Sequence, residues 1–103
     1  MHIVVLVTAS KNAEARSIAQ GLLEKKLVAC VNIIEKAHSF FWWEKKIDQA
    51  TESLLIIKSK KKNLPKIIET VKSLHSYTVP EIIALPIVGG NKEYLEWIDE
   101  SVR

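Results

Sequence analysis

The stretch from Leu27 to Ser59 constrains the fold more than any other part of the chain. It is rich in β-branched and aromatic residues on both sides of a polar turn at Glu44-Lys45-Lys46, which is typical of two paired strands. Each arm has about 15 residues and reaches about 50 Å at roughly 3.3 Å per residue. A compact domain of this size has a radius of gyration of about 13 Å. We therefore expect a hairpin that is longer than the body that carries it.

The aromatic residues of this hairpin alternate between two faces. Phe40 and Trp42 are predicted to face one way, and Phe41 and Trp43 the other. An antiparallel hairpin on its own normally keeps one face in water. We therefore expect both faces to be covered, at least partly by other copies of the chain, although the pattern does not say what such an assembly does.

The segments around the hairpin predict a ferredoxin-like fold. His2 to Thr8 is a continuous apolar run typical of a central strand, and Glu81 to Val88 predicts another strand, which Pro86 favours at a sheet edge. Apolar stripes at helical spacing predict helices whose N-caps are Asn12, Asn63 and Asn91. The order β-α-β-β-α-β with an extra C-terminal helix predicts one α+β domain over residues 1–103, with both long helices on one face of a four-stranded antiparallel sheet.

Composition and charge exclude several classes of protein. Apolar residues make up 48% of the chain, and a net charge of +3 from 15 basic and 12 acidic residues requires neither nucleic acid nor an anionic membrane. RNA-binding domains of this topology carry aromatic residues on the first and third strands, which here read HIVVLV and SLLIIK. The chain shows no signal peptide or membrane span, and its single cysteine suits a reducing compartment. We expect a cytoplasmic protein with no nucleic-acid or membrane partner.

Candidate chemistry is restricted to two side chains. The chain has no nucleophile elbow, no zinc-protease motif and no phosphate-binding glycine loop, so we expect it not to be an enzyme. Cys30 and His75 are candidate ligands, since a thiol and an imidazole suit copper or zinc. Cys30 is equally explained as a small buried hydrophobe in a strand, and His75 as a histidine stabilised at a helix C-terminus. Both interpretations stay open at this point.

Several short blocks resemble the CutA divalent-cation tolerance family. Their order extends over essentially the whole chain: Ala29-Cys30-Val31-Asn32, Ser39-x-Phe41-x-Trp43, Glu52, Lys58-Ser59, His75-Ser76-Tyr77-Thr78-Val79-Pro80-Glu81 and Tyr94-Leu95-x-Trp97-Ile98. The resemblance implies a compact homotrimer with long hairpins packed between subunits. It also implies a role in tolerance of copper and other divalent cations, with copper binding at Cys30 and His75.

The chain departs from the pattern of the family at several positions. Ser76 stands where proline is usual, Phe41 where tyrosine is usual, and Lys45 where glycine is usual. Leu74 stands where some relatives carry a second histidine. We therefore expect copper binding to be weak, with Cys30 and His75 as two separate candidate sites.

A cleft between subunits is the other predicted site. The segment from His75 to Glu81 is expected to line it, because Pro80 restricts the loop and holds Tyr77 and Glu81 in place. Trp43 and Lys58 are the further candidate cleft residues.

Two other function classes stay open. One is a PII-like trimeric sensor of a small molecule or signal, although the short hairpin tip has no glycine and does not resemble a nucleotide-binding loop. The other is a scaffold for a partner protein, which would leave no mark in the sequence.

Overall fold

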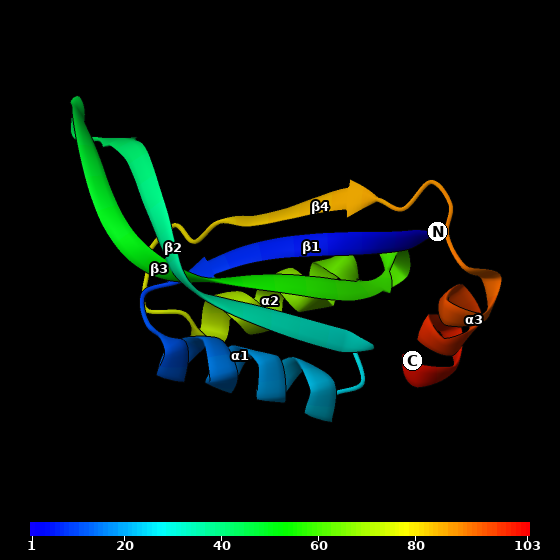
Figure 1. Cartoon of the computed structure of the whole chain (residues 1–103). Coiled ribbons are helices and arrows are strands. Elements are labelled where there is room, and N and C mark those ends of the chain that lie inside the picture. The colour runs from blue at the N-terminus through cyan, green and yellow to red at the C-terminus, as the bar shows by residue number, and fades with distance from the viewer.

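The computed structural model describes residues 1–103, which form four strands and three α-helices. The strands are β1 (His2–Ala9), β2 (Cys30–Trp43), β3 (Lys46–Lys60) and β4 (Ile82–Pro86). The helices are α1 (Asn12–Glu24), α2 (Leu64–Leu74), which follows a short 3₁₀ turn at Lys61–Asn63, and α3 (Lys92–Ser101). All neighbouring strands are antiparallel, in the order β2-β3-β1-β4, and α1 and α2 cover one face of the sheet (Figure 1). The predicted ferredoxin-like α+β fold is confirmed.

The core lies between the sheet and helices α1 and α2. Every second residue of β1 is buried, as the two-residue period of a strand with one face on the core requires. The apolar stripes of the two helices meet that face. The core cluster comprises Ile3, Val5, Val7, Ala9, Ala15, Ile18, Leu22, Leu27, Val28, Leu55, Ile57, Ile67 and Val71.

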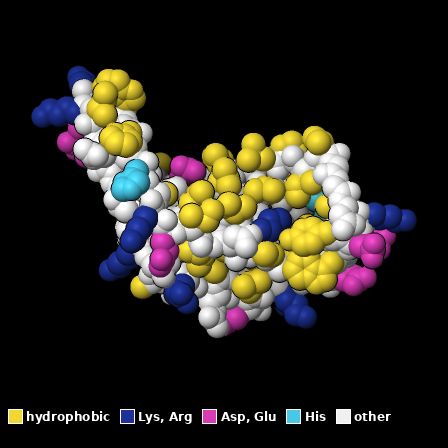
Figure 2. All heavy atoms as spheres, in the orientation of Figure 1, with side chains coloured by type: hydrophobic (Ala, Val, Ile, Leu, Met, Phe, Trp, Pro, Cys, Tyr) yellow, Lys and Arg dark blue, Asp and Glu magenta, His cyan; other side chains and the backbone are white.

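Helix α3 packs at one end of the opposite face of the sheet, where Asp99 contacts His2 and Lys60, and no helix covers the rest of that face. Ile83 and Leu85 on β4 and Ile34 on β2 belong to this face by their register with β1 and β3, and each is about half exposed, at 51%, 48% and 50%. Figure 2 shows hydrophobic side chains gathered beside β4. A contiguous apolar surface of this kind is typical of an interaction face. A single chain therefore leaves a large apolar area uncovered.

The long hairpin is present, but its turn and its shape differ from the prediction. Its turn consists of Glu44 and Lys45 alone, both with positive φ (49° and 65°), and Lys46 already pairs with Trp43. The pairing shifts between Ile34 and Ala37, which is a β-bulge, and a bulge bends and twists a strand. The outer half of the hairpin therefore leans away from the body (Figure 1), and the longest dimension of the molecule is 44 Å.

Several predicted element ends were wrong. The edge strand is shorter than Glu81–Val88, and β2 begins only at Cys30. Asn91 caps α3 as predicted, because its side chain accepts a hydrogen bond from the Glu93 N–H. Asn63 instead donates to the buried carbonyl of Leu27 at 3.1 Å, and α1 begins at Asn12 after Lys11, with no side-chain cap. None of the helices is both long and apolar enough to cross a lipid bilayer.

Candidate functional site

A cavity of about 860 Å³ lies between the outer half of the hairpin and the loop that joins α2 to β4. The bulge after Ile34 helps to create it, since it turns the outer hairpin away from the body and leaves a hollow between the two (Figure 2). The lining residues come from the hairpin, from the loop and from the end of β1. They are Ser39, Phe40, Phe41, Trp43, Asp48 and Glu52, then Ser76, Tyr77, Thr78, Val79 and Glu81, and finally Thr8.

A partly buried hydrogen bond joins the α2–β4 loop to the hairpin. The Tyr77 hydroxyl donates to Glu52 Oε2 at 2.8 Å, and Glu52 is only 7% exposed. Burial, the bond to Glu52 and the negative charges of Glu52 and Glu14 raise the pKa of Tyr77 to about 12. The phenol therefore stays protonated at neutral pH and acts as a donor to the carboxylate.

His75 ties the same loop to β1. Its side chain is fully buried; Nε2 lies 2.7 Å from the carbonyl oxygen of Thr8, and Nδ1 lies 3.0 Å from the backbone nitrogen of Tyr77. A carbonyl only accepts and a backbone N–H only donates, so this geometry assigns the neutral tautomer with its proton on Nε2. Both ring nitrogens are engaged. Metal binding at His75 therefore requires one of these hydrogen bonds to break.

Glu14, on helix α1, makes the third set of contacts that hold the α2–β4 loop in place. Its carboxylate accepts hydrogen bonds from the Ser10 hydroxyl at 2.7 Å, from the Ser76 hydroxyl at 3.1 Å and from the Ser76 N–H. Burial by itself raises the pKa of Glu14, but the hydrogen bonds from Ser10 and Ser76 outweigh this effect and, with a smaller electrostatic contribution from the neighbouring His75 ring, lower the pKa to about 2. The start of α1 and the loop after α2 are thus joined through one ionised carboxylate.

Cys30 lies far from His75. It pairs with Lys58, which pairs with Val4 on β1, whereas His75 contacts Thr8, four residues further along that strand. That offset is about 13 Å at roughly 3.3 Å per residue. The two predicted ligands do not share an ion in one chain, and no three His, Cys, Asp or Glu side chains gather closely enough to hold a metal ion.

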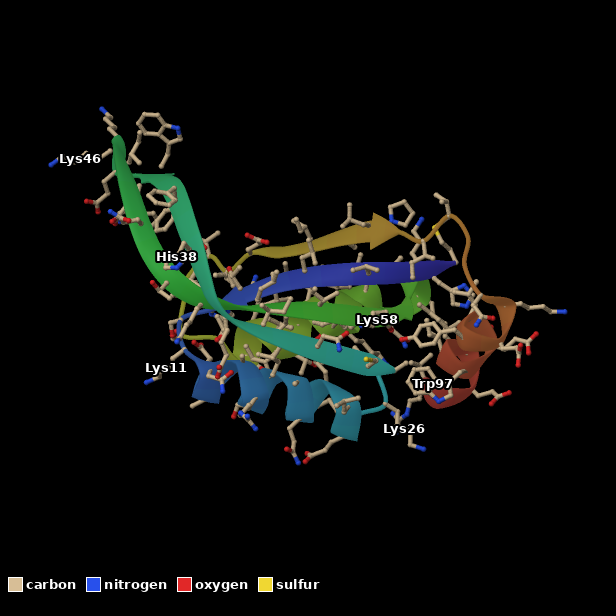
Figure 3. All side chains as sticks on the ribbon, in the orientation of Figure 1. Lys11, Lys26, His38, Lys46, Lys58 and Trp97 are labelled. Atoms are coloured by element: carbon tan, nitrogen blue, oxygen red, sulfur yellow. The ribbon has the colours of Figure 1, made fainter.

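The surroundings of Cys30 are polar. Its thiol is partly exposed and lies 3.8 Å from Asn32 Oδ1, which also accepts a hydrogen bond from the Lys58 ammonium group. Cys30 lies in a strand as predicted, but it is only partly buried, so the interpretation of Cys30 as a small buried hydrophobe is wrong on burial. Figure 3 places Lys58 on the body of the sheet, away from the hairpin tip where Lys46 lies.

The structure brings together three of the five predicted cleft residues. Trp43, Tyr77 and Glu81 line one cavity, and Pro80 belongs to the same loop but is not among the lining residues. Lys58 lies outside this cavity in a single chain. Whether the cleft is completed by a second subunit stays a prediction.

Sequence reasoning missed Asp48 and the cavity position of Glu52. Asp48 pairs directly with Phe41 and therefore shares its face of the hairpin. The alternation of side chains along the hairpin could have placed Asp48 on this face, but only with the correct turn length. The predicted turn has three residues, whereas the turn in the structure has two. The longer turn moves each pairing by one residue and assigns Asp48 to a different partner.

Comparison with known proteins shows close relatives over the full length of the chain. The family model described as CutA1 divalent ion tolerance protein matches residues 3–101. The divalent-cation tolerance protein CutA of Archaeoglobus fulgidus is 51% identical over 103 residues, which is 100% of both chains. The chloroplastic protein CutA 1 of Oryza sativa is 46% identical over 98% of this chain and 57% of its own length.

Solved structures of such proteins have the same fold. The divalent cation tolerance protein of Thermus thermophilus superposes with a TM-score of 0.98 at 46% identity, covering 100% of each chain. The Archaeoglobus fulgidus protein, called a periplasmic divalent cation tolerance protein, superposes with a TM-score of 0.97 at 50% identity, again over 100% of each chain.

Proposed function

This chain belongs to the CutA1 divalent ion tolerance protein family, and on that premise we propose that it contributes to tolerance of divalent cations as a homotrimer. The observation that carries the proposal is the match to the family over residues 3–101. A cytoplasmic location stays a prediction, because names of its relatives include chloroplastic and periplasmic forms.

Assembly is supported by the apolar surface that one chain leaves exposed. Phe40, Trp42 and Trp43 on the outer hairpin are 68%, 73% and 57% exposed, and Ile34, Ile83 and Leu85 expose further apolar surface on the part of the sheet that no helix covers. Permanent interfaces are large and resemble a domain core. Light scattering at micromolar concentration should give three times the 11.7 kDa mass of the chain. A monomeric mass would contradict the proposal.

Copper binding is proposed at Cys30, with His75 as the weaker candidate. The Cys30 thiol is partly exposed and its hydrogen bond to Asn32 is long, whereas both ring nitrogens of His75 are engaged. A thiolate favours Cu(I), and imidazole suits copper and zinc. Each chain supplies a single thiol, so the site is weak.

Calorimetry of the purified protein tests this assignment. Cu(II), Zn(II) and, under anaerobic conditions, Cu(I) are titrated into the wild type, Cys30→Ser and His75→Ala, with His38→Ala as the control because His38 is an exposed histidine on the hairpin. Cys30→Ser should lose most Cu(I) binding and His38→Ala should bind like the wild type. Equal binding by all four proteins would remove Cys30 and His75 from the site.

A second candidate function is the sensing of a small molecule. The cavity of about 860 Å³ favours it, because sites for small ligands typically enclose about 300 to 1,000 Å³. A role as a scaffold for a partner protein stays a prediction that affinity capture would test.

A further inference from the structure

Five exposed lysines gather at the end of the molecule that lies away from the tip of the hairpin. They come from the turn after α1, from the 3₁₀ turn before α2 and from the first turn of α2, and they are Lys25, Lys26, Lys61, Lys62 and Lys66. The two turns lie side by side because the Asn63 side chain donates to the buried carbonyl of Leu27 at 3.1 Å. Figure 3 shows Lys26 at this end and Lys46 at the other. We call these five lysines the basic end.

The basic end carries the excess positive charge of the chain. The chain has 15 basic and 12 acidic residues, so once these five lysines are set apart ten basic residues remain for the 12 acids. None of the five forms an ion pair, whereas Lys60 pairs with Asp99 and Lys92 with Glu96. The charge of the basic end is therefore left for solvent or for a partner to neutralise.

Three of these lysines lie where positive charge is unfavourable. The dipole of a helix makes its N-terminus positive, and acidic residues normally occupy the first turn. The first turn of α2 has no acidic residue, and Asn63 makes no capping hydrogen bond with its side chain. Lys61, Lys62 and Lys66 add three positive charges to that helix end. A sequence that breaks a local rule without a compensating contact in the fold typically does so for a function.

The basic end is separate from the surface that we assign to assembly. That surface comprises the outer hairpin and the part of the sheet that no helix covers. Helices α1 and α2 lie on the other face of the sheet, and the basic end is formed by their adjoining ends (Figure 1). Copies that assemble through the apolar surface therefore leave these lysines in water. A homotrimer would present them three times, which favours a partner with several binding segments.

Helix α3 shows which kind of segment binds beside these lysines. Its acidic residues are Glu93, Glu96, Asp99 and Glu100. The Asp99 carboxylate lies 2.9 Å from His2 Nε2 and 3.5 Å from the ammonium group of Lys60, which directly precedes Lys61. An acidic helix is thus already held by basic side chains next to the basic end.

The composition of the basic end favours carboxylates over phosphates. Lysine presents a single point of charge, whereas the planar fork of arginine matches phosphate oxygens in pairs. All five members are lysines. The basic end also has no aromatic member on which a nucleic-acid base could stack. Carboxylates that are spaced along a helix can each meet one ammonium group.

We propose that the basic end binds an acidic helical segment of a partner protein, whose carboxylates lie along one face of the helix and pair with these lysines. This inference rests on the scaffold role and names the chemistry of the partner. It is independent of copper binding at Cys30. Because the contacts lie at the surface, raised salt should weaken them.

Calorimetry of the assembled protein with four defined probes tests the proposal. The first probe is an alanine-rich helical peptide with glutamates along one face, and the second is the same peptide with glutamines instead. The third is an oligothymidylate with as many negative charges as the first peptide, and the fourth is a vesicle that contains phosphatidylserine. The glutamate peptide should bind about tenfold or more tightly than the glutamine peptide, and more tightly than the oligothymidylate or the vesicle. Its affinity should fall as salt is raised.

Two variants with the same loss of charge separate the basic end from general charge effects. Lys62→Gln/Lys66→Gln should weaken binding of the glutamate peptide about tenfold, because two ion pairs are lost. Lys11→Gln/Lys45→Gln is the matched control, since both lysines are exposed and lie outside the basic end, and it should bind like the wild type. Thermal unfolding at low salt is a second measurement. Lys62→Gln/Lys66→Gln should unfold at a higher temperature than the wild type, because it removes positive charge from the N-terminus of α2.

Several results would overturn the proposal in distinguishable ways. Equal binding of the two peptides, or tighter binding of the oligothymidylate or the vesicle, would refute an acidic helix as the partner. A lower unfolding temperature of Lys62→Gln/Lys66→Gln would show that these lysines stabilise the fold instead. A partner captured equally well by the wild type and by Lys62→Gln/Lys66→Gln would keep the scaffold role but refute this surface. Failure of the wild type to bind the peptide or to capture any partner would refute both.

Discussion

Glu14→Gln should reveal how strongly one carboxylate holds the α2–β4 loop. The substitution keeps the shape of the side chain but removes the charge that accepts hydrogen bonds from Ser10 and Ser76. The side chain is only 8% exposed, so solvent screens these bonds little. An amide offers one accepting oxygen, and its NH₂ group would face the donors of Ser10 or Ser76.

The magnitude follows from the pKa of Glu14. A fall from 4.5 to about 2 corresponds to about 3 kcal/mol of folding free energy at neutral pH, at about 1.36 kcal/mol per unit. Because the pKa is lowered in the folded state, this stabilisation is complete above about pH 5 and is lost as the pH falls toward 2. At pH 3 about half of it should remain.

Guanidinium unfolding at fixed protein concentration measures the effect, since oligomer stability depends on concentration. The wild type should be about 3 kcal/mol more stable than Glu14→Gln at pH 7, and the two should converge near pH 2. Glu24→Gln is the control, because Glu24 is an exposed acid on the same helix and should change stability by less than about 0.5 kcal/mol. Parallel pH profiles of the wild type and Glu14→Gln would refute the reasoning.

Three further predictions concern the hairpin, the core and the loop. Lys45→Gly should stabilise the fold by about 0.5 to 1 kcal/mol, because glycine accepts the positive φ of 65° without strain. Lys46→Gly, within β3, should destabilise the fold, and thermal unfolding of the two variants distinguishes these effects. Leu55→Ala should cost about 2 to 5 kcal/mol in denaturant unfolding because Leu55 is fully buried, and Leu23→Ala, at 42% exposure, much less. Tyr77→Phe should cost about 1.5 to 3 kcal/mol, since Glu52 loses its donor. Because the pKa of Tyr77 is raised in the folded state, the stabilisation by its hydrogen bond to Glu52 is complete below about pH 10 and is lost as the pH rises through about 12. Ultraviolet titration of the wild type should show one phenol that ionises near pH 12, and this phenol should be absent from Tyr77→Phe.

The elements and their order were predictable because the signals that specify them are local. The alternating burial of β1 and the apolar stripes of the helices follow from strand and helix periods, which depend on neighbouring residues alone. The cap of α3 at Asn91 involves a backbone N–H only two residues away. The ferredoxin-like topology then follows from the order of elements and the handedness of their connections.

The register and the bend of the hairpin could not be predicted from local sequence signals. Its existence was clear from composition, but its register depends on whether the turn has two or three residues, and Glu44 and Lys45 adopt a positive φ that neither residue type favours. The bulge between Ile34 and Ala37 has no sequence mark, yet it bends the arm that forms one wall of the cavity.

The candidate site was decided by contacts between segments that are distant in the sequence. His75 was predicted as a ligand from its chemistry, but its contact with the Thr8 carbonyl, 67 residues away, occupies a ring nitrogen that a metal would use. Glu14 meets Ser76 across 62 residues, and Tyr77 meets Glu52 across 25. The sequence by itself determines which side chains can donate, accept or carry charge. Only the packing of the α2–β4 loop against β1 and the hairpin determines which of these groups satisfy one another and which remain free to bind a ligand, because a buried polar group is satisfied by whichever partner the fold brings within about 3 Å.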